Sequence, residues 1–527
     1  LSALGLARLN EHLHQSWATP HHLVGQTLMD GLLVGLSTAL SFSNLLFVAA
    51  GCLIGMLIGM LPGLGPISAI ALMIPISYNL EPSSGMILLA GVYYGAIFGG
   101  STSAILINAP GVAGTVATAF DGYPMARNGQ AGKALAVAAY ASFFGGTIAV
   151  VMLMISAPAL ANLSLAFQSL EYTLMMLLGL SLVASFSEPG QYLKAIMMAA
   201  IGLCLSTVGT DLASGIPRFT FGRMDLIDGI SFLMLAMATF ALTEALMMLR
   251  AEQPTQTIIP TIPSQALRLE TQEIRSIAPV ISRSAVLGFL IGVLPGAGAT
   301  IASFIAYGFE KVIAKAPRPP FGQGNLKGLA APESANNAAC TGSFVPLLTL
   351  GIPGSGTTAI LLGALLAYGI QPGPRLYLDE PTVFWSIVVS MYIGNLILLF
   401  FNLPMIPIFA KLLNIPRAIL APLIIFFSLT GVYLVSFNLF DLYLMIAFAL
   451  VAVWLRRRAF PMAPMLLGFI LGGLLEDNLR RSLIISDGNL SYLLDRPISL
   501  VLATLIFLAL IAPLAQKLIR GTFNARS

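Results

Sequence analysis

The sequence predicts an all-α polytopic membrane protein made of two inverted-topology repeats, each with a re-entrant helical hairpin and a broken transmembrane helix. Besides the two hairpins, about 11 full crossings are expected. Three observations predict this fold class: a composition too apolar for a water-facing surface, proline-glycine pairs that recur in the same order, and a distribution of Lys and Arg that orients the two repeats oppositely.

The composition places the chain in a membrane. Hydrophobic residues make up 57% of the 527 residues and charged residues only 9%, whereas a soluble domain carries roughly 25% charged residues. The mean hydropathy is +0.89. The 50 glycines and 32 prolines lie largely within apolar segments, where they indicate close helix packing and broken helices.

The positions of His and Cys exclude several kinds of site. All four histidines lie within residues 1–28, a polar stretch that we expect to be a disordered or artificial extension. The rest of the chain therefore has no histidine for a proton relay or a zinc site. The three cysteines lie far apart in apolar runs, which fits neither a metal site nor a disulfide framework. No cofactor and no nucleic-acid partner are expected.

An internal duplication is visible in two pairs of motifs. GMLIGMLPGLG at 55–65 matches GFLIGVLPGAG at 288–298 with an offset of 233 residues. GGSTSAILINAPG at 99–111 matches GSFVPLLTLGIPG at 342–354 with an offset of 243 residues. Two matched pairs at nearly one offset indicate that the chain is a repeat.

The two copies divide the chain into domains. The first repeat is expected over 29–250 and the second over 251–476, followed at 477–527 by an extra transmembrane helix with a cytoplasmic tail. With this tail in the cytoplasm, most clusters of Lys and Arg fall on the cytoplasmic side. The broken helices of the two repeats then run in opposite directions, which is typical of secondary transporters.

The two proline-glycine pairs of a repeat have different surroundings. Around the first pair (Pro62 and Pro295), each apolar arm has roughly 15 residues or fewer, about 22 Å of helix, whereas the hydrocarbon core is about 30 Å thick. We therefore predict a hairpin that does not cross. Residues 85–124 and 329–370 are each long enough for one crossing, interrupted at the second pair.

The breaks are the predicted binding sites. A helix that begins at a break presents N–H groups and a positive dipole end to an anion, and a helix that ends there presents carbonyls that suit Na⁺. Neither broken helix carries Lys or Arg, so an anion would be held by N–H groups, hydroxyls and bound cations. The candidate substrate-binding residues are Ser101, Thr102, Asn108, Gly111, Gly114, Thr115, Gly354, Ser355, Gly356, Thr357 and Thr358. The candidate ion-binding residues are Gly63, Gly65, Asn108, Gly296, Gly298, Thr300, Asn337 and Gly351.

One acidic residue stays ambiguous. Glu333 stands in the stretch APESANNA at the start of the second broken helix. A carboxylate within the membrane is a functional candidate, but a charge near a helix start at the interface is an equally good interpretation.

Several motifs resemble a known family. GMLPGLGP, FGGSTSAILINAPG, FDGYP, APESANNA and LTLGIPGSGTTAILLGALLAYGIQPGP resemble the large membrane subunit of bacterial tripartite tricarboxylate transporters, over about Met29 to Arg520. The resemblance implies a multi-pass permease of the bacterial inner membrane that works with a small membrane subunit and a periplasmic substrate-binding protein. It also implies uptake of citrate-like tri- or dicarboxylates with Na⁺ or H⁺, and it carries the substrate role onto residues 108–115 and 351–358. Residues 1–28 depart from the family pattern.

The expected function is therefore secondary active transport by alternating access, with an elevator-type movement and without enzyme activity. Buried acids are scarce, which favours Na⁺ over H⁺ as the coupling ion. A passive anion channel is one alternative. An intramembrane enzyme is another, although the chain has no HExxH or GxSxG motif. GIPGSGTTA at 351–359 has the glycines of a dinucleotide loop, but it lies in an apolar helix with no preceding strand.

Overall fold

The structure is a computed structural model that describes residues 20–61, 64–164, 167–181, 191–211, 213–249, 267–294, 298–315, 319–373, 376–410, 417–489 and 496–508. Most of these residues are helical. They include seven helices that are long and apolar enough to cross a membrane, and six shorter apolar helices of 10–17 residues. The predicted class, an all-α polytopic membrane protein, is confirmed.

The first half of the chain contains ten α-helices with their connecting turns in the described residues. These elements are α2 (Pro20–Ala39), α3 (Phe42–Gly59), α4 (Gly65–Ser77), α5 (Pro82–Ile107), η1 (Ala113–Thr115), α6 (Val116–Met125), η2 (Ala126–Gln130), α7 (Ala131–Ser164), α8 (Ser169–Ser181), α9 (Tyr192–Ser206), β1 (Gly209–Thr210), β2 (Pro217–Arg218), η4 (Met224–Leu226), α10 (Phe232–Ala236), η5 (Met237–Leu242) and α11 (Thr243–Met248). The two short strands pair antiparallel.

The described residues of the second half form helices joined by turns and loops, with no strand among them. Its elements are α12 (Thr271–Val293), α13 (Gly298–Ile313), α14 (Leu326–Gly342), α15 (Phe344–Leu350), α16 (Gly356–Ala367), α17 (Leu376–Asp379), α18 (Pro381–Asn402), α19 (Ile406–Phe409), α20 (Arg417–Ser436), α21 (Leu439–Arg457), α22 (Ala463–Ile485) and a last helix at Pro497–Leu508.

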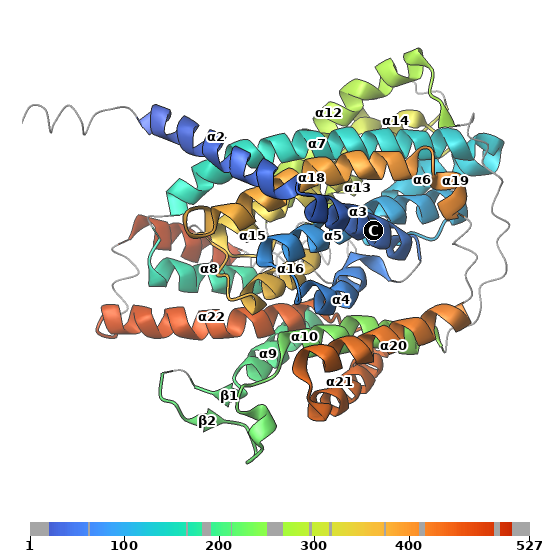
Figure 1. The fold of residues 1–527 in the computed structure, drawn as a ribbon. Helices are drawn as coiled ribbons and strands as arrows, with labels where there is room; N and C mark the ends of the chain where they lie inside the picture. The colour runs from blue at the N-terminus through green and yellow to red at the C-terminus, as the bar shows by residue number, and fades with distance from the viewer. Residues whose placement is uncertain are drawn as a thin grey trace, which may run out of the picture.

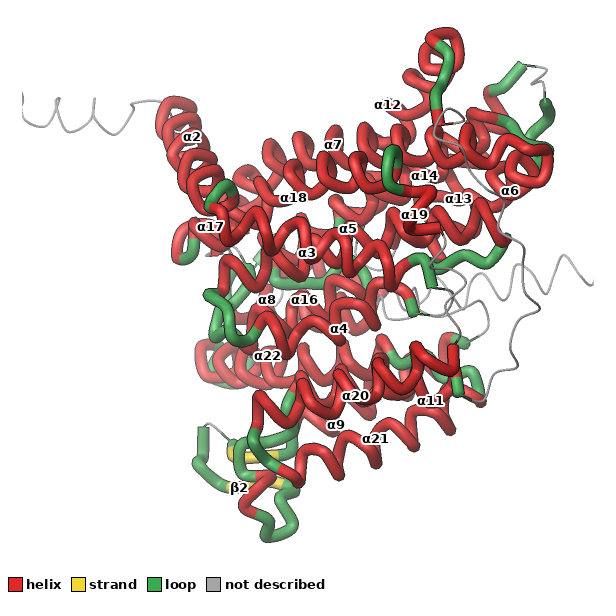
Figure 2. Tube along the Cα trace, turned by 45° about the vertical axis from the view of Figure 1, so that its right-hand side comes forward, coloured by secondary structure: helices red, strands yellow, loops and turns green. Residues whose placement is uncertain are grey.

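Most long helices lie side by side (Figure 1). Helices α7 and α18 lie toward one side of the bundle, with α12 farther out on that side, and α20 and α21 lie toward the opposite side. Helices α3, α5, α4 and α16 lie between them. Figure 2 shows the same order from a second direction. The largest hydrophobic core cluster includes residues from α3, α4, α5, α16 and α18, so the interrupted segments lie inside the bundle and not on its lipid-facing rim.

Glycine stripes allow two pairs of helices to touch at the backbone. A Cβ atom built on Gly55 of α3 would lie 2.2 Å from the carbonyl oxygen of Val92 in α5. A Cβ atom built on Gly288 of α12 would lie 2.4 Å from the carbonyl oxygen of Ala335 in α14. Both distances are far below van der Waals contact, so the close helix packing that the glycines in apolar segments predicted is confirmed at these two contacts.

Both predicted hairpin segments form two helices separated at the first proline-glycine pair, but their first arms are longer than expected. The prediction that neither arm is long enough to cross is wrong for α3, with 18 residues, and α12, with 23 residues. A physical reason is visible in α12, where Arg283 donates from Nη2 to Glu310 Oε2 of α13 at 2.6 Å. This pairing neutralises two charges that would be costly to place separately within apolar helices.

The N-terminal region also differs from expectation. Helix α2 begins at Pro20, so residues 20–28, which we expected to be an unstructured extension, are helical. Residues 1–19 lie outside the described residues. Farther along α2, a Cβ atom built on Gly35 would lie 2.7 Å from the carbonyl oxygen of Trp385 in α18, so this helix packs tightly on the bundle.

A buried aspartate joins the two halves of the chain. Asp121 of α6 is 0% exposed, and its Oδ1 accepts hydrogen bonds from the N–H groups of Gly322, Gly324 and Asn325 at 2.9, 2.9 and 2.7 Å. Asn325 is the N-cap of α14, where its side chain accepts from the N–H of Lys327. The carboxylate therefore fixes the start of α14 against α6.

Candidate substrate and ion site at the helix breaks

The first break separates α5 from α6 over residues 108–115. Asn108 ends α5 in the left-handed conformation, with a φ of 52°. Ser103 Oγ accepts a hydrogen bond from the N–H of Gly111 at 3.1 Å, and Thr115 Oγ1 donates to the carbonyl of Val112 at 2.8 Å. These hydroxyls hold the break as a defined turn, and Ser103 is a support that the list of candidates did not contain.

The second break separates α15 from α16. Gly351 ends α15 with a φ of 70°, and Ser355 is the N-cap of α16. Ser355 Oγ accepts from the N–H of Thr358 at 3.2 Å, while Thr358 Oγ1 accepts from the N–H of Ser355 at 2.8 Å. This capping box fixes the helix start. The first N–H groups of α16, from Gly356 and Thr357, have no partner within the helix.

Each break packs on the last turn of a hairpin helix. A Cβ atom on Gly111 would lie 1.9 Å from the carbonyl oxygen of Gly59 in α3, and a Cβ atom on Gly354 would lie 3.2 Å from the carbonyl oxygen of Gly292 in α12. The candidates Gly111 and Gly354 can therefore offer only backbone groups to a ligand. Gly111 has no room for a side chain.

The two breaks also meet a shared helix. A Cβ atom on Gly114 would lie 2.4 Å from Asn336 Oδ1 in α14, and a Cβ atom on Gly354 would lie 2.8 Å from the Cβ of Ser343, the residue that ends α14. Asn336 and Ser343 are seven residues apart, about 10 Å along a helix with a rise of 1.5 Å per residue. The structure thus brings two motifs that are more than 200 residues apart in sequence to within about two helical turns.

The hairpin candidates lie at the starts of the second arms. Gly65 and Gly298 begin α4 and α13 with φ values of 56° and 62°. Thr300 lies in the first turn of α13, and this helix contacts η1 of the first break. Gly63 and Gly296 lie outside the described residues. Helix α13 therefore lies close to the break between α5 and α6.

The ambiguity about Glu333 is resolved. This residue lies about two turns into α14 and is 0% exposed, so the interpretation as an interfacial helix-start charge is wrong. Its Oε2 accepts hydrogen bonds from Ser101 Oγ at 2.8 Å and Ser142 Oγ at 2.9 Å, and its Oε1 accepts from Thr118 Oγ1. The carboxyl group thereby connects α14 with α5, α6 and α7.

Two amides beside Glu333 are incompletely paired. Asn337 Nδ2 donates to the carbonyl of Glu333 at 3.0 Å, but Asn337 Oδ1 and Asn336 Nδ2 are buried and make no hydrogen bond to the described residues. Buried amide groups without partners are rare and call for an explanation. The polar run of Glu333 to Asn337 inside an apolar segment was the sequence signal for this cluster, but Thr118 and Ser142 carried no such signal.

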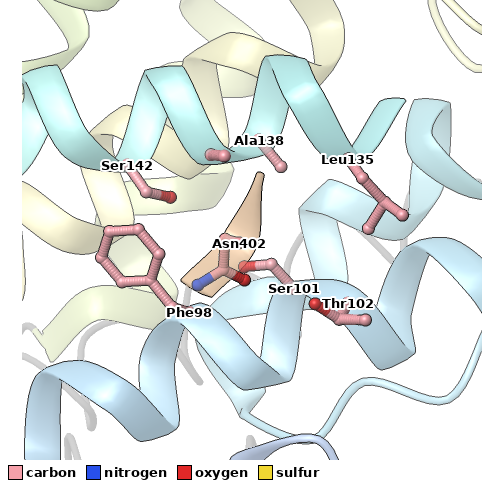
Figure 3. A pocket seen from close by; sticks show the side chains of 8 residues that line it. Phe98, Ser101, Thr102, Leu135, Ala138, Ser142 and Asn402 are labelled. Atoms are coloured by element: carbon pink, nitrogen blue, oxygen red, sulfur yellow. The ribbon is translucent and has the colours of Figure 1, made fainter. Parts of the chain in front are cut away.

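A small cavity adjoins the hydroxyls that bind Glu333 (Figure 3). Its volume is about 10 Å³, which is close to the space that one water-sized species needs. Ser101 and Thr102, both substrate candidates, line it together with Ser142 and Asn402. The remaining lining residues are apolar, namely Phe98, Leu135, Ala138 and Ala139.

Charged residues at the β1–β2 end of the molecule form a network. Arg480 Nη1 donates to Asp211 Oδ1 at 3.0 Å, and Arg218 Nη1 donates to Glu476 Oε1 at 2.8 Å. The hydroxyl of Ser214 donates to Asp211 Oδ2 at 2.6 Å. This hydrogen bond, with help from Arg480, lowers the pKa of Asp211 to about 2.

The chain is similar in sequence to known proteins over most of its length. The sequence model of the tripartite tricarboxylate transporter TctA family matches residues 45–467. A protein of Agrobacterium vitis, described as an uncharacterized 52.8 kDa protein in the TAR-I ttuC' 3' region, is 43% identical over 90% of this chain and 93% of its own length. A second Agrobacterium vitis protein, described as an uncharacterized protein in the TAR-II ttuC' 3' region, is 45% identical over 44% of this chain and 96% of its own length. No solved structure matches the chain.

Proposed function

Because the chain belongs to the tripartite tricarboxylate transporter TctA family, which is a family of transporters and not of enzymes, we propose that it is the permease subunit of a secondary transporter for citrate-like tri- or dicarboxylates. It takes substrate from a periplasmic binding protein and works with a small membrane subunit in the bacterial inner membrane. The C-terminal tail faces the cytoplasm.

One observation carries this proposal. The two breaks meet α14 about two turns apart, at Asn336 and Ser343, which suits a small molecule with several carboxylates. N–H groups at the start of α16 and hydroxyls near the breaks supply donors without a fixed positive charge. The candidate substrate residues at 108–115 and 354–358 belong to this site.

Inverted repeats are part of the proposal, over 29–250 and 251–476, with 477–527 added after them. Equivalent contacts support the duplication. Gly55 contacts Val92, and Gly288 contacts Ala335. Gly288 follows Gly55 by the offset of 233 residues, and Ala335 follows Val92 by the offset of 243 residues. The contacts of α5 with α14 support the inversion.

Those contacts give the two helices opposite directions. Ser101 of α5 meets Glu333, and Tyr94, earlier in α5, meets Thr341, later in α14, with 2.6 Å between the two hydroxyl oxygens. The two equivalent broken helices therefore run antiparallel. This relation is the geometry that alternating access by two inverted halves requires, and we propose an elevator-type movement with Na⁺ as the coupling ion.

Thiol labelling tests the substrate site. The native Cys204 is exposed, whereas Cys52 and Cys340 are buried. Ser355→Cys, made in a Cys204→Ser background and reconstituted in liposomes, should react with a membrane-permeant maleimide more slowly when citrate is present. Cys204 in the otherwise native chain is the control, and its labelling should not change with citrate. Labelling of Ser355→Cys that is the same with and without any carboxylate would contradict the site.

A further inference from the structure

We propose that the cavity between α5, α7 and α18 is a Na⁺ site, with Glu333 as the negative charge that balances the ion. This inference rests on the proposed function and gives its coupling ion a place away from the helix breaks. The cavity is the one lined by Ser101, Thr102, Ser142 and Asn402 (Figure 3).

The charge balance is the first argument. Glu333 is 0% exposed, and none of the ion pairs among the described residues includes it, whereas buried Glu310 is paired with Arg283. An isolated carboxylate in a membrane interior is strongly disfavoured unless a cation or a proton accompanies it. Three hydroxyls donate to the Glu333 carboxyl group, and such donation suits the ionised form.

The donor set at the cavity is the second argument. Ser101 and Ser142 each connect the cavity wall to Glu333 Oε2. Thr102, although 1% exposed, makes no hydrogen bond to any described residue, so its hydroxyl oxygen is available. Asn402 donates its Nδ2 to the carbonyl of Leu398 at 2.9 Å, which leaves its Oδ1 as an acceptor. These side chains offer neutral oxygen atoms, as do the backbone carbonyls that coordinate Na⁺ in transporters.

Size is the third argument. A volume of about 10 Å³ accommodates one water-sized species and excludes a carboxylate substrate. The walls also come from helices of different parts of the chain, namely α5 and α7 of the first repeat and α18 of the second. A cation bound here would therefore stabilise one arrangement of these helices over another, which is what coupling needs.

Direct binding of radioactive sodium to the purified full chain in detergent tests the site. The native protein should bind Na⁺ that excess NaCl displaces and choline chloride does not. Glu333→Gln should abolish this binding, and Ser142→Ala, which removes one hydroxyl, should weaken it at least tenfold. Ser390→Ala is the matched control, because Ser390 is a buried serine of α18 that bonds to the carbonyl of Ile387 in its own helix. It should bind as the native chain does.

Two outcomes would overturn the inference. One is Na⁺ binding by both Glu333→Gln and Ser142→Ala with native affinity. The other is a native chain that binds no Na⁺ but takes up citrate when only a pH gradient is imposed, with uptake lost in Glu333→Gln, since Glu333 would then carry a proton. Citrate exchange by the native permease, reconstituted with its small membrane subunit and its periplasmic binding protein, separates these results from a failure of the proposed function. Exchange shows that the complex transports citrate, whatever the sodium-binding result.

Discussion

Gly292 of α12 faces the backbone of Ala339 in α14 so closely that a Cβ atom on the glycine would lie 2.3 Å from the Ala339 carbonyl oxygen. The equivalent pair in the first half has the same geometry, since a Cβ atom on Gly59 would lie 2.2 Å from the carbonyl oxygen of Ala96. Gly59 and Gly292 both lie in the last turn of their helices, and their carbonyl oxygens lie near Gly111 and Gly354 of the two breaks. A shift in either contact would therefore displace the proposed site.

Gly292→Ala should therefore destabilise the protein by about 1–3 kcal/mol, the usual cost of an overpacked contact, and Gly59→Ala should do the same. The midpoint of thermal unfolding in detergent measures this effect. Gly308→Ala is the control, because Gly308 lies in α13 with nothing within 4 Å of a built Cβ atom. Alanine favours helix there. Equal stability of Gly292→Ala and the native protein would show that the helices separate at no cost.

The antiparallel contact of α5 and α14 predicts an energetic coupling between Tyr94 and Thr341, whose hydroxyl oxygens are 2.6 Å apart. A double-mutant cycle with Tyr94→Phe and Thr341→Val should give a coupling free energy of about 1 kcal/mol, the typical value for a hydrogen bond. The free energies of unfolding in detergent of the native protein, the two single variants and the double variant give this coupling. The same cycle with Tyr94→Phe and Ser390→Ala should give no coupling. If both cycles give the same value, this contact between the two helices is not formed.

The low pKa of Asp211 predicts an acid-sensitive loop. Its folded pKa of about 2 lies below the ordinary value of about 3.9, so its carboxylate stabilises the folded loop fully above about pH 4 and progressively less down to about pH 2. Phe221 is 86% exposed, and pepsin cleavage near it reports on the loop. As the pH falls from about 4 to about 2, the ratio of the cleavage rate of the native protein to that of Asp211→Asn, measured at each pH, should rise. A constant ratio of the two cleavage rates would contradict the prediction.

The sequence by itself determined the fold class and the positions of the breaks. Apolar segment length, proline-glycine pairs and the spacing of glycines are local properties of the sequence. They limit where helices can run and end, whatever those helices pack against. Thus Asn108 and Gly351 end helices at the breaks that were predicted, and Gly55 and Gly288 make close helix contacts of the kind that glycines in apolar segments predicted. The resemblance of the motifs to a transporter family was confirmed by the family model that matches residues 45–467.

The tertiary structure decided which polar groups meet. Glu333 receives hydroxyls from Ser101 and Ser142, which lie 232 and 191 residues away in the chain, and no local pattern distinguishes Ser142 from any other serine in an apolar helix. Arg283 and Glu310 illustrate the same point, because their pairing lets two charged residues sit where separate charges would end a membrane segment. Which hydrogen-bond or ion-pair partner a buried polar side chain meets depends on how the helices pack, and that packing is a property of the whole chain.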